Sequence, residues 1–384
     1  MSNFIVPGKI FHGLGAFSQM ICLSGKRAFI VTGKGAMFRS GYIEKAIFYL
    51  NNCNQMSVEV FEGVEVDPSI ETVMRGVNIM MRYQPDLIIG LGGGGAIDAA
   101  KAMWVFYEHP DTRFEDITRP FTIKTLHKRA QFVAIPSTSV ITETSCVSVI
   151  TDQKSGIKYP LISYELCPDI AIIDGELCRS MPPHVTANTG LGALTHAIEA
   201  YVTSPTNVYV DCLAERAIID IFEALPIVFE NGNNLKVRQK MHDASCLAGI
   251  SYCNTLFGGV HSLAYQIVGK FGVPYGRANA ILLPAVIRFT EKSALQKYTK
   301  LMSLLKARNI GDVVTKIERL CHNLSVEQSF SEVGIERSDW FEHIQSMAQF
   351  AMRYECSVRN SNLVGLSLDD MMKILTESFY GKDW

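Results

Sequence analysis

The chain has 384 residues, of which 48% are hydrophobic and 19% charged, and its formal net charge at pH 7 is −2. This is the composition of a globular protein, and the small net charge gives no electrostatic reason to expect nucleic acid or a membrane surface as a partner. No apolar run is long enough to cross a bilayer, and Met1–Lys9 lacks the basic start and apolar core of a signal peptide.

Cysteines are scattered through the chain. There are ten of them, and no two are spaced as C-x-x-C, so neither a zinc ribbon nor a thioredoxin-like site is indicated. Scattered cysteines in a chain of this size are typical of reduced and mostly buried thiols. We therefore expect a cytoplasmic protein.

Buried strands and helices alternate through the first half of the chain. Apolar or alternating runs predict strands at Arg27–Gly33, Met56–Phe61, Asp86–Gly90, Phe132–Pro136 and Ile170–Asp174. Helical spacing predicts helices at Tyr42–Leu50 and Ile70–Tyr83. Strands separated by helices in this way indicate a parallel α/β sheet.

From about Pro182 onward the pattern becomes helical. Helices are predicted at Ala193–Val202, Asp211–Phe229, Val237–Asn254, Ala294–Ala307 and Asp369–Phe379. We therefore expect an N-terminal α/β domain over residues 1–178 and an all-helical C-terminal domain over residues 179–384. The cleft between two such domains is the default place for a site.

A glycine run follows the predicted strand Asp86–Gly90 and opens a helix. Its glycines Gly92–Gly95 allow the backbone to approach a phosphate closely, and the helix N-terminus supplies free N–H groups and partial positive charge. The letters satisfy G-x-G-x-x-G, but consecutive glycines make that match easy, and no convincing ribose-binding acid follows about 20 residues later. The run predicts a phosphate-binding loop, with a simple strand-to-helix turn as the alternative.

The segment Gly92–Lys101 resembles the phosphate loop Gly-Gly-Gly-Ser-x-x-Asp-x-x-Lys of the iron-containing (group III) alcohol dehydrogenases. The resemblance continues in order through Val149–Asp152, Gly156–Leu161, Pro168–Asp174, Pro182–Gly190, Ala193–Tyr201 and Asn279–Pro284. It implies a Rossmann-like dinucleotide-binding domain with a helical domain, as in the dehydroquinate synthase-like fold. It also implies a homodimer and NAD(P)-linked interconversion of small carbonyl compounds and alcohols.

The resemblance also implies which residues contact the cofactor. These are Gly33, Gly92, Gly93, Gly94, Gly95, Asp98, Ser137, Thr138, Thr142 and Lys158. Gly33 ends the first predicted strand, where NAD-preferring members often carry Asp. The missing carboxylate would not repel a 2′-phosphate, and Lys34 can attract one, so NADPH is favoured over NADH; a plain turn glycine explains the position equally well.

The loop after the strand Phe132–Pro136 departs from the family. The family usually has Thr-Thr-x-Gly-Thr-Gly-Ser-Glu there, whereas Ser137–Glu143 is one residue shorter, with β-branched Val140 and Ile141 in the stretch where the glycines are lost. We expect this cofactor loop to have a different shape here.

The family's metal site is largely lost. In the family an Asp and a His at i and i+4, with two later His, bind a divalent metal. The corresponding positions are Gly192, His196, His261 and Tyr275, and Tyr265 replaces a further histidine involved in proton transfer. Because catalytic zinc sites usually have three protein ligands, two imidazoles are too few, and Glu199 fits a structural role better than that of a third ligand. We expect no bound metal.

Two accounts of this loss remain open. In the first, the protein is a metal-independent carbonyl reductase in which Tyr265 or Tyr275 donates the proton, given a neighbour that lowers its pKa, with His261 or His196 as partner. In the second, the tyrosines only fill vacated volume, and the protein is an inactive nucleotide-binding partner or regulator.

Overall fold

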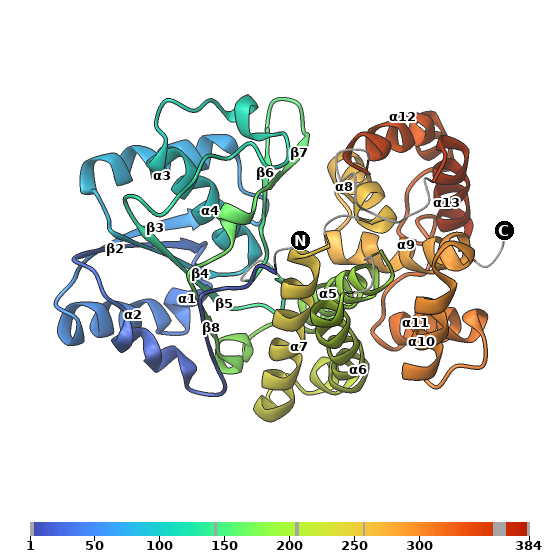
Figure 1. The fold of residues 1–384 in the computed structure, drawn as a ribbon, viewed down its shortest axis with the longest axis horizontal. Helices are drawn as coiled ribbons and strands as arrows, with labels where there is room; N and C mark the ends of the chain where they lie inside the picture. Colours follow the sequence, from blue (N-terminus) through green and yellow to red (C-terminus); the bar gives the residue numbers. More distant parts are fainter. Residues whose placement is uncertain (1–3, 142–143, 204–206, 256–257, 356–365, 382–384) are drawn as a thin grey trace. The chain divides into compact units, whose positions relative to one another are not determined.

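The computed structural model describes residues 4–141, 144–203, 207–255, 258–355 and 366–381, so Thr142 lies outside the described residues. The chain divides into two compact units (Figure 1). The first consists of Met1–Met181 and Asn233–Gly249, and the second of Pro182–Gly232 and Ile250–Trp384. The expected boundary after residue 178 lies near Met181, but the sequence pattern did not indicate that Asn233–Gly249 returns to the first unit.

The first unit contains a six-stranded parallel sheet in the order β1-β8-β5-β4-β2-β3. Its strands are β1 (Lys9–His12), β2 (Arg27–Gly33), β3 (Ser57–Val64), β4 (Leu87–Gly92), β5 (Gln131–Pro136) and β8 (Ile170–Ile173). An antiparallel pair is formed by β6 (Val147–Thr151) and β7 (Lys158–Ile162). The helices are α1 (Ala36–Arg39), α2 (Tyr42–Phe48), α3 (Ile70–Tyr83) and α4 (Gly94–Glu108), and α7 (Leu235–Cys253) enters this unit later.

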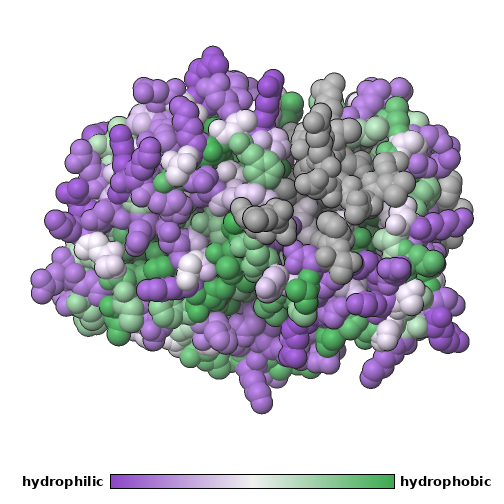
Figure 2. Space-filling view, viewed as in Figure 1, coloured by the Kyte–Doolittle hydropathy of each residue, from purple (hydrophilic) through white to green (hydrophobic). Residues whose placement is uncertain are grey.

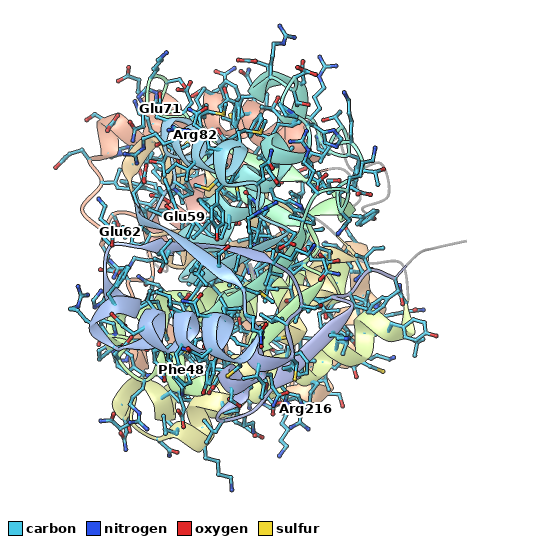
Figure 3. All side chains as sticks on the ribbon, turned by 90° about the vertical axis from the view of Figure 1, so that its left-hand side faces the viewer. Phe48, Glu59, Glu62, Glu71, Arg82 and Arg216 are labelled. Atoms are coloured by element: carbon cyan, nitrogen blue, oxygen red, sulfur yellow. The ribbon has the colours of Figure 1, made fainter. Side chains whose placement is uncertain are left out.

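Helices cover both faces of this sheet. Successive side chains of a strand point to opposite faces, so the apolar side chains on each face need a covering layer. Phe29 and Val31 of β2 belong to the apolar cluster that includes residues of α3 and α4. Ala28 and Ile30 belong to the cluster on the other face, with residues of α1 and α2. In Figure 3 the sheet lies between α3, labelled at Glu71 and Arg82, and α2, labelled at Phe48. The predicted α/β architecture is confirmed.

The edge strand β3 is protected by charge. Glu59 and Glu62, labelled in Figure 3, are exposed side chains on this strand. Charged side chains on an edge discourage pairing with other strands. Polar residues also cover most of the upper surface of the first unit in the space-filling view of Figure 2.

The second unit is helical in its described residues. Its helices are α5 (Pro183–Thr203), α6 (Val208–Glu230), α8 (Gly259–Phe271), α9 (Tyr275–Thr290), α10 (Leu295–Leu304), α11 (Ile310–Asn323), α12 (Arg337–Glu355) and α13 (Leu368–Tyr380). The sequence pattern predicted α5, α6, α10 and α13 but not the other four, of which α8 begins at a glycine and α9 contains Pro284. None of the described helices is long and apolar enough to span a membrane.

Candidate active site

In the turn between β4 and α4, a side chain larger than glycine would collide with the backbone of a neighbouring loop. A Cβ on Gly95 would lie 2.3 Å from the carbonyl oxygen of Val66 and 2.8 Å from that of Glu65. Gly92 has φ +154°, in the region that favours glycine. The turn therefore brings the bare backbone and the N-terminus of α4 close to the loop after β3, as a phosphate-binding loop needs.

The loop after β5 lies against this turn. The backbone N–H of Ser137 donates to the carbonyl of Gly92 at 2.8 Å. The hydroxyl of Thr138 lies 3.7 Å from the position of a Cβ on Gly93. This hydroxyl is buried and has no hydrogen-bond partner among the residues that the structure describes. An unsatisfied buried donor beside a glycine turn fits a phosphate or ribose oxygen of a dinucleotide.

Cations surround the end of β2, beside the same turn. A Cβ on Gly92 would lie 3.8 Å from the backbone nitrogen of Gly33. Two residues further on, Gly35 has φ +96°, and Nη1 of Arg39 lies 3.2 Å from the position of a Cβ on Gly35. Lys34 and Arg39 are both exposed. Arg39 was missed by the sequence analysis, since it lies a helical turn beyond the glycine and outside any motif.

Asp98 and Lys101 connect α4 to the chain that forms β6, and Lys158 of β7 pairs with the loop after β3. Lys101 donates from Nζ to the carbonyls of Ser145 and Val147, at 2.6 and 3.2 Å. Burial raises the pKa of Asp98 to about 7, against the effects of Lys101 and of the Val149 N–H that Asp98 accepts. Lys158 forms an ion pair with Asp67. The predicted cofactor residues Asp98 and Lys158 thus already have partners within the protein.

In the second unit, His196 of α5 and His261 of α8 lie side by side, with ring centroids 4.1 Å apart. Nδ1 of His196 donates to the carbonyl of Gly192 at 2.6 Å, and Nδ1 of His261 contacts the carboxyl group of Glu199. Burial lowers the pKa of His261 to about 3 and that of His196 well below its usual value. Both imidazoles are therefore neutral.

Glu199 is the closest partner of His261, a role that the sequence analysis missed. It accepts the backbone N–H of Val260 at 2.7 Å, and Gly258 leaves room for it, since a Cβ there would lie 2.4 Å from its Oε1. Burial raises the pKa of Glu199 to about 8, so its carboxyl group keeps its proton at lower pH. Nε2 of His261 is buried and has no partner among the described residues.

Two tyrosines lie beside the two imidazoles, and a third stacks on one of these tyrosines. The ring centroid of Tyr275 lies 6.2 Å from that of His196 and 5.9 Å from that of His261, and Tyr265 stacks on Tyr275 at 5.0 Å. The ring of Tyr252, which the sequence analysis did not single out, lies 4.5 Å from His196 and 4.8 Å from His261. We call these five residues the imidazole–tyrosine cluster.

The backbone of α9 sets the place of Tyr275. A Cβ on Gly276 would lie 1.8 Å from the carbonyl oxygen of Asn188, so glycine allows the first turn of α9 to contact α5. Burial, followed by the effects of Tyr265 and Tyr252, raises the pKa of Tyr275 well above its usual value. Tyr275 is thus a neutral phenol, and the lowered pKa expected of a catalytic tyrosine is not found there.

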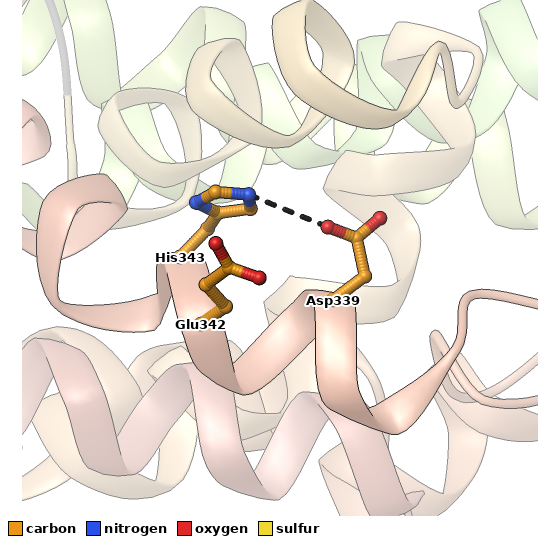
Figure 4. Close-up of side chains that lie close together, drawn as sticks. All are labelled: Asp339, Glu342 and His343. Carbon is orange, nitrogen blue, oxygen red and sulfur yellow. Dashed lines mark ion pairs between the residues drawn. The ribbon is translucent and has the colours of Figure 1, made fainter.

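The four positions that hold the metal in the family do not fit a metal here. Gly192 has no donor atom and the phenol of Tyr275 keeps its proton, so only the two imidazoles remain as ligands. Three protein ligands are usual in catalytic zinc sites. Among the described residues, the one cluster of three His, Cys or acidic side chains with suitable spacing is Asp339, Glu342 and His343 on α12 (Figure 4). There Nε2 of His343 pairs with Asp339 at 3.3 Å, and both acids are exposed.

A parallel sheet with a glycine turn at its carboxyl edge is typical of dinucleotide-binding proteins. Residues 7–175 match the iron-containing alcohol dehydrogenase family, and residues 186–379 match the C-terminal part of the Fe-containing alcohol dehydrogenase family. The chain belongs to the iron-containing alcohol dehydrogenases, which are oxidoreductases.

The chain is similar in sequence to known proteins over nearly its full length. The chain is 41% identical over 390 residues to the NADPH-dependent butanol dehydrogenase of Clostridium saccharobutylicum, covering 100% of this chain and 99% of that one. It is 36% identical to the 1-propanol dehydrogenase of Citrobacter freundii, covering 92% and 93%. The iron-containing alcohol dehydrogenase structure from Thermococcus thioreducens superposes with a TM-score of 0.91 at 27% identity, covering 99% and 100%.

Proposed function

We propose that this protein is an NADPH-dependent oxidoreductase that interconverts a small carbonyl compound and its alcohol without a catalytic metal. The observation that carries the proposal is the imidazole–tyrosine cluster, which takes the place of the family's metal ligands. The relatives named for butanol and 1-propanol support a small aliphatic alcohol or aldehyde as substrate.

Bound NADPH supplies the hydride to the carbonyl carbon. The carbonyl oxygen takes a proton from Tyr275 or Tyr265, and the product is the alcohol. Since the pKa of Tyr275 is raised, its phenol keeps the proton until negative charge develops on the substrate oxygen. Tyr265 stacks on Tyr275, so it can pass a proton to that phenol. His261 and His196 hold the tyrosines from the other side of the cluster.

The end of β2 supports NADPH over NADH. Gly33 carries no carboxylate to repel a 2′-phosphate, and Lys34 and Arg39 place two cations within the next turn. An Arg guanidinium suits phosphate recognition because its donors form a planar fork. NADH is the alternative cofactor.

One observation favours the second candidate, an inactive nucleotide-binding partner or regulator. The hydroxyl of Tyr275 is buried and its pKa is raised, as expected of an aromatic side chain that only fills volume. In that case the phosphate loop binds the dinucleotide, but the cluster performs no proton transfer.

Turnover of tyrosine variants distinguishes these candidates. NADPH oxidation is measured with a panel of short aldehydes and ketones for the wild type, Tyr265→Phe and Tyr275→Phe. We expect the proton donor's variant to lose at least about tenfold in kcat, since general acid catalysis contributes at least that much. Tyr298→Phe is the matched control, because it removes a buried hydroxyl bonded to Thr290 in the same unit. Full activity of both test variants excludes tyrosine as the acid, and NADPH binding without turnover of any carbonyl supports the inactive protein.

The remaining expectations belong to the same proposal. We expect a homodimer in the cytoplasm that acts on small molecules and has neither nucleic acid nor a membrane as its partner. Sedimentation of the purified protein checks the dimer directly.

A further inference from the structure

Helix α7 presents one face to the loop that follows β5. His242, Cys246 and Gly249 are spaced at i, i+4 and i+7, so they lie on the same side of the helix. His242 contacts Ser139, and Cys246 and Gly249 both contact Thr144. Both segments belong to the first unit.

His242 forms the first of these contacts. It is fully buried; its Nδ1 lies 3.3 Å from the hydroxyl oxygen of Ser139, and its imidazole also bonds the carbonyl of Pro136. Burial lowers the pKa of His242 to about 4, so the ring is neutral, with one N–H to donate and one lone pair to accept. The sulfur of Cys178 lies 3.6 Å from Nδ1 and 3.8 Å from Nε2, so it packs against the ring.

The other two contacts hold the far end of the loop. The hydroxyl of Thr144 donates to the carbonyl of Cys246 at 3.1 Å. A Cβ on Gly249 would lie 2.3 Å from that hydroxyl oxygen and 2.8 Å from the carbonyl of Ile141, so only glycine admits the loop there. The loop has lost the family's two glycines and is supported by α7 instead.

Thr138 lies between two fixed neighbours. Ser137 is bonded through its N–H to Gly92 of the glycine turn, and Ser139 is bonded to His242 of α7. The Thr138 hydroxyl between them is buried, has no partner among the described residues and lies beside Gly93. A hydroxyl held in this way can donate to a phosphate oxygen with little loss of conformational entropy.

We propose that His242 is a positioning residue for the cofactor, which holds Ser139 against α7 and so directs the Thr138 hydroxyl toward the phosphates of the dinucleotide. The inference rests on the proposed function only in that the chain binds NADPH. It assigns a cofactor role to a residue of the helical half of the sequence, far from any cofactor motif.

The test measures the dissociation constant of NADPH by fluorescence titration and the thermal midpoint of the full chain. We expect His242→Phe and Ser139→Ala each to raise the dissociation constant about tenfold, as the loss of one hydrogen bond to a charged group predicts. Because both substitutions break the same link, the double variant is expected to be no weaker than the worse single variant. His242→Gln keeps a donor and an acceptor and is expected to restore most of the affinity. In His242→Phe the KM for NADPH should rise more than kcat falls.

Thr144→Val is the matched control, because it removes a hydrogen bond of the same loop to the same helix at the end away from Thr138. We expect it to lower the thermal midpoint about as much as Ser139→Ala while the dissociation constant stays within twofold. The inference about His242 is overturned if Thr144→Val weakens NADPH binding equally. It is also overturned if Ser139→Ala or His242→Phe is folded and binds NADPH as the wild type does. Neither result overturns the proposed function. A wild type that binds neither NADPH nor NADH overturns the proposed function as well.

Discussion

Glu199 and His261 form a buried pair in which the carboxyl group of one contacts Nδ1 of the other. The side chains are 3% and 0% exposed, so neither group exchanges its partner for water. The carboxyl also accepts the N–H of Val260 at the first turn of α8, which fixes the helix that carries both His261 and Tyr265. The pair therefore sets the position of half of the imidazole–tyrosine cluster.

Removing the carboxyl should destabilise the protein strongly. We expect Glu199→Ala to lower the free energy of unfolding by about 3 kcal/mol, because it leaves buried donors unsatisfied. Glu199→Gln should cost about 1 kcal/mol or less at pH 6, because its amide reproduces the donor and the acceptor of a protonated carboxyl. Urea unfolding measures both, with Ser262→Ala as a control for the loss of a buried hydrogen bond in the same helix. Equal losses for Gln and Ala would show that Glu199 is ionised.

The same pair predicts a pH dependence. The folded pKa of Glu199, about 8, lies above its unfolded value of about 4.3, so the folded state binds more protons between these values. The contribution of Glu199 to stability is thus fully present below about pH 4 and is lost as the pH rises through about 8. We expect the stability of Glu199→Gln relative to the wild type to increase by about 2 kcal/mol or more from pH 5 to pH 9. A constant difference over this range would contradict the raised pKa.

Two glycines of the phosphate loop should respond differently to alanine. We expect Gly95→Ala to lower the unfolding free energy by about 2 kcal/mol, because its Cβ would lie 2.3 Å from a backbone carbonyl that cannot move aside cheaply. For Gly93→Ala the nearest atom is at 3.6 Å, an ordinary contact, and we expect a loss within about 1 kcal/mol. The denaturant midpoints of the two variants check this prediction. Similar midpoints would mean that the loop after β3 moves to make room for the added Cβ.

The cations at the end of β2 should set the cofactor preference. We expect Arg39→Ala and Lys34→Ala each to weaken NADPH binding about tenfold while NADH binding stays within twofold, since each loses one charged contact to the 2′-phosphate. Gly33→Asp should invert the preference. Lys45→Ala is the control, because that nearby cation lies over the ring of Phe17 instead. A parallel loss of affinity for both cofactors would place Arg39 and Lys34 away from the 2′-phosphate.

Many strands and helices of the α/β half could be predicted from local sequence patterns. The strand Arg27–Gly33 and the helix Ile70–Tyr83 have the predicted bounds, because a buried apolar run and a helical periodicity each determine one element. The sequence analysis did not predict the short edge strand β1 or the pair β6–β7, although β6 (Val147–Thr151) is rich in β-branched residues. The return of α7 to the first unit depends on contacts of His242 and Gln239 that no local pattern encodes.

The candidate site, too, could be predicted from the sequence only in part. The i, i+4 spacing of His261 and Tyr265 places them on one face of α8, a helix that the sequence pattern did not predict. Tyr252 could not be found, because its place beside His196 and His261 arises from the packing of separate helices. The glycines Gly258 and Gly276 resemble turn residues in sequence, whereas in the fold they admit Glu199 and the carbonyl of Asn188.

The metal content of the purified wild type tests the central claim most directly. Elemental analysis after purification without chelators, and again after addition of Fe²⁺ or Zn²⁺ and gel filtration, gives the metal bound per chain. The double variant Gly192→Asp, Tyr275→His is the positive control, since a Cβ on Gly192 has its nearest neighbour at an ordinary 3.4 Å. We predict far less than one equivalent of iron or zinc in the wild type, with NADPH-dependent reduction that chelators do not affect, and a gain of metal in the double variant. One equivalent of tightly bound iron or zinc in the wild type, with activity lost on its removal, would contradict the account.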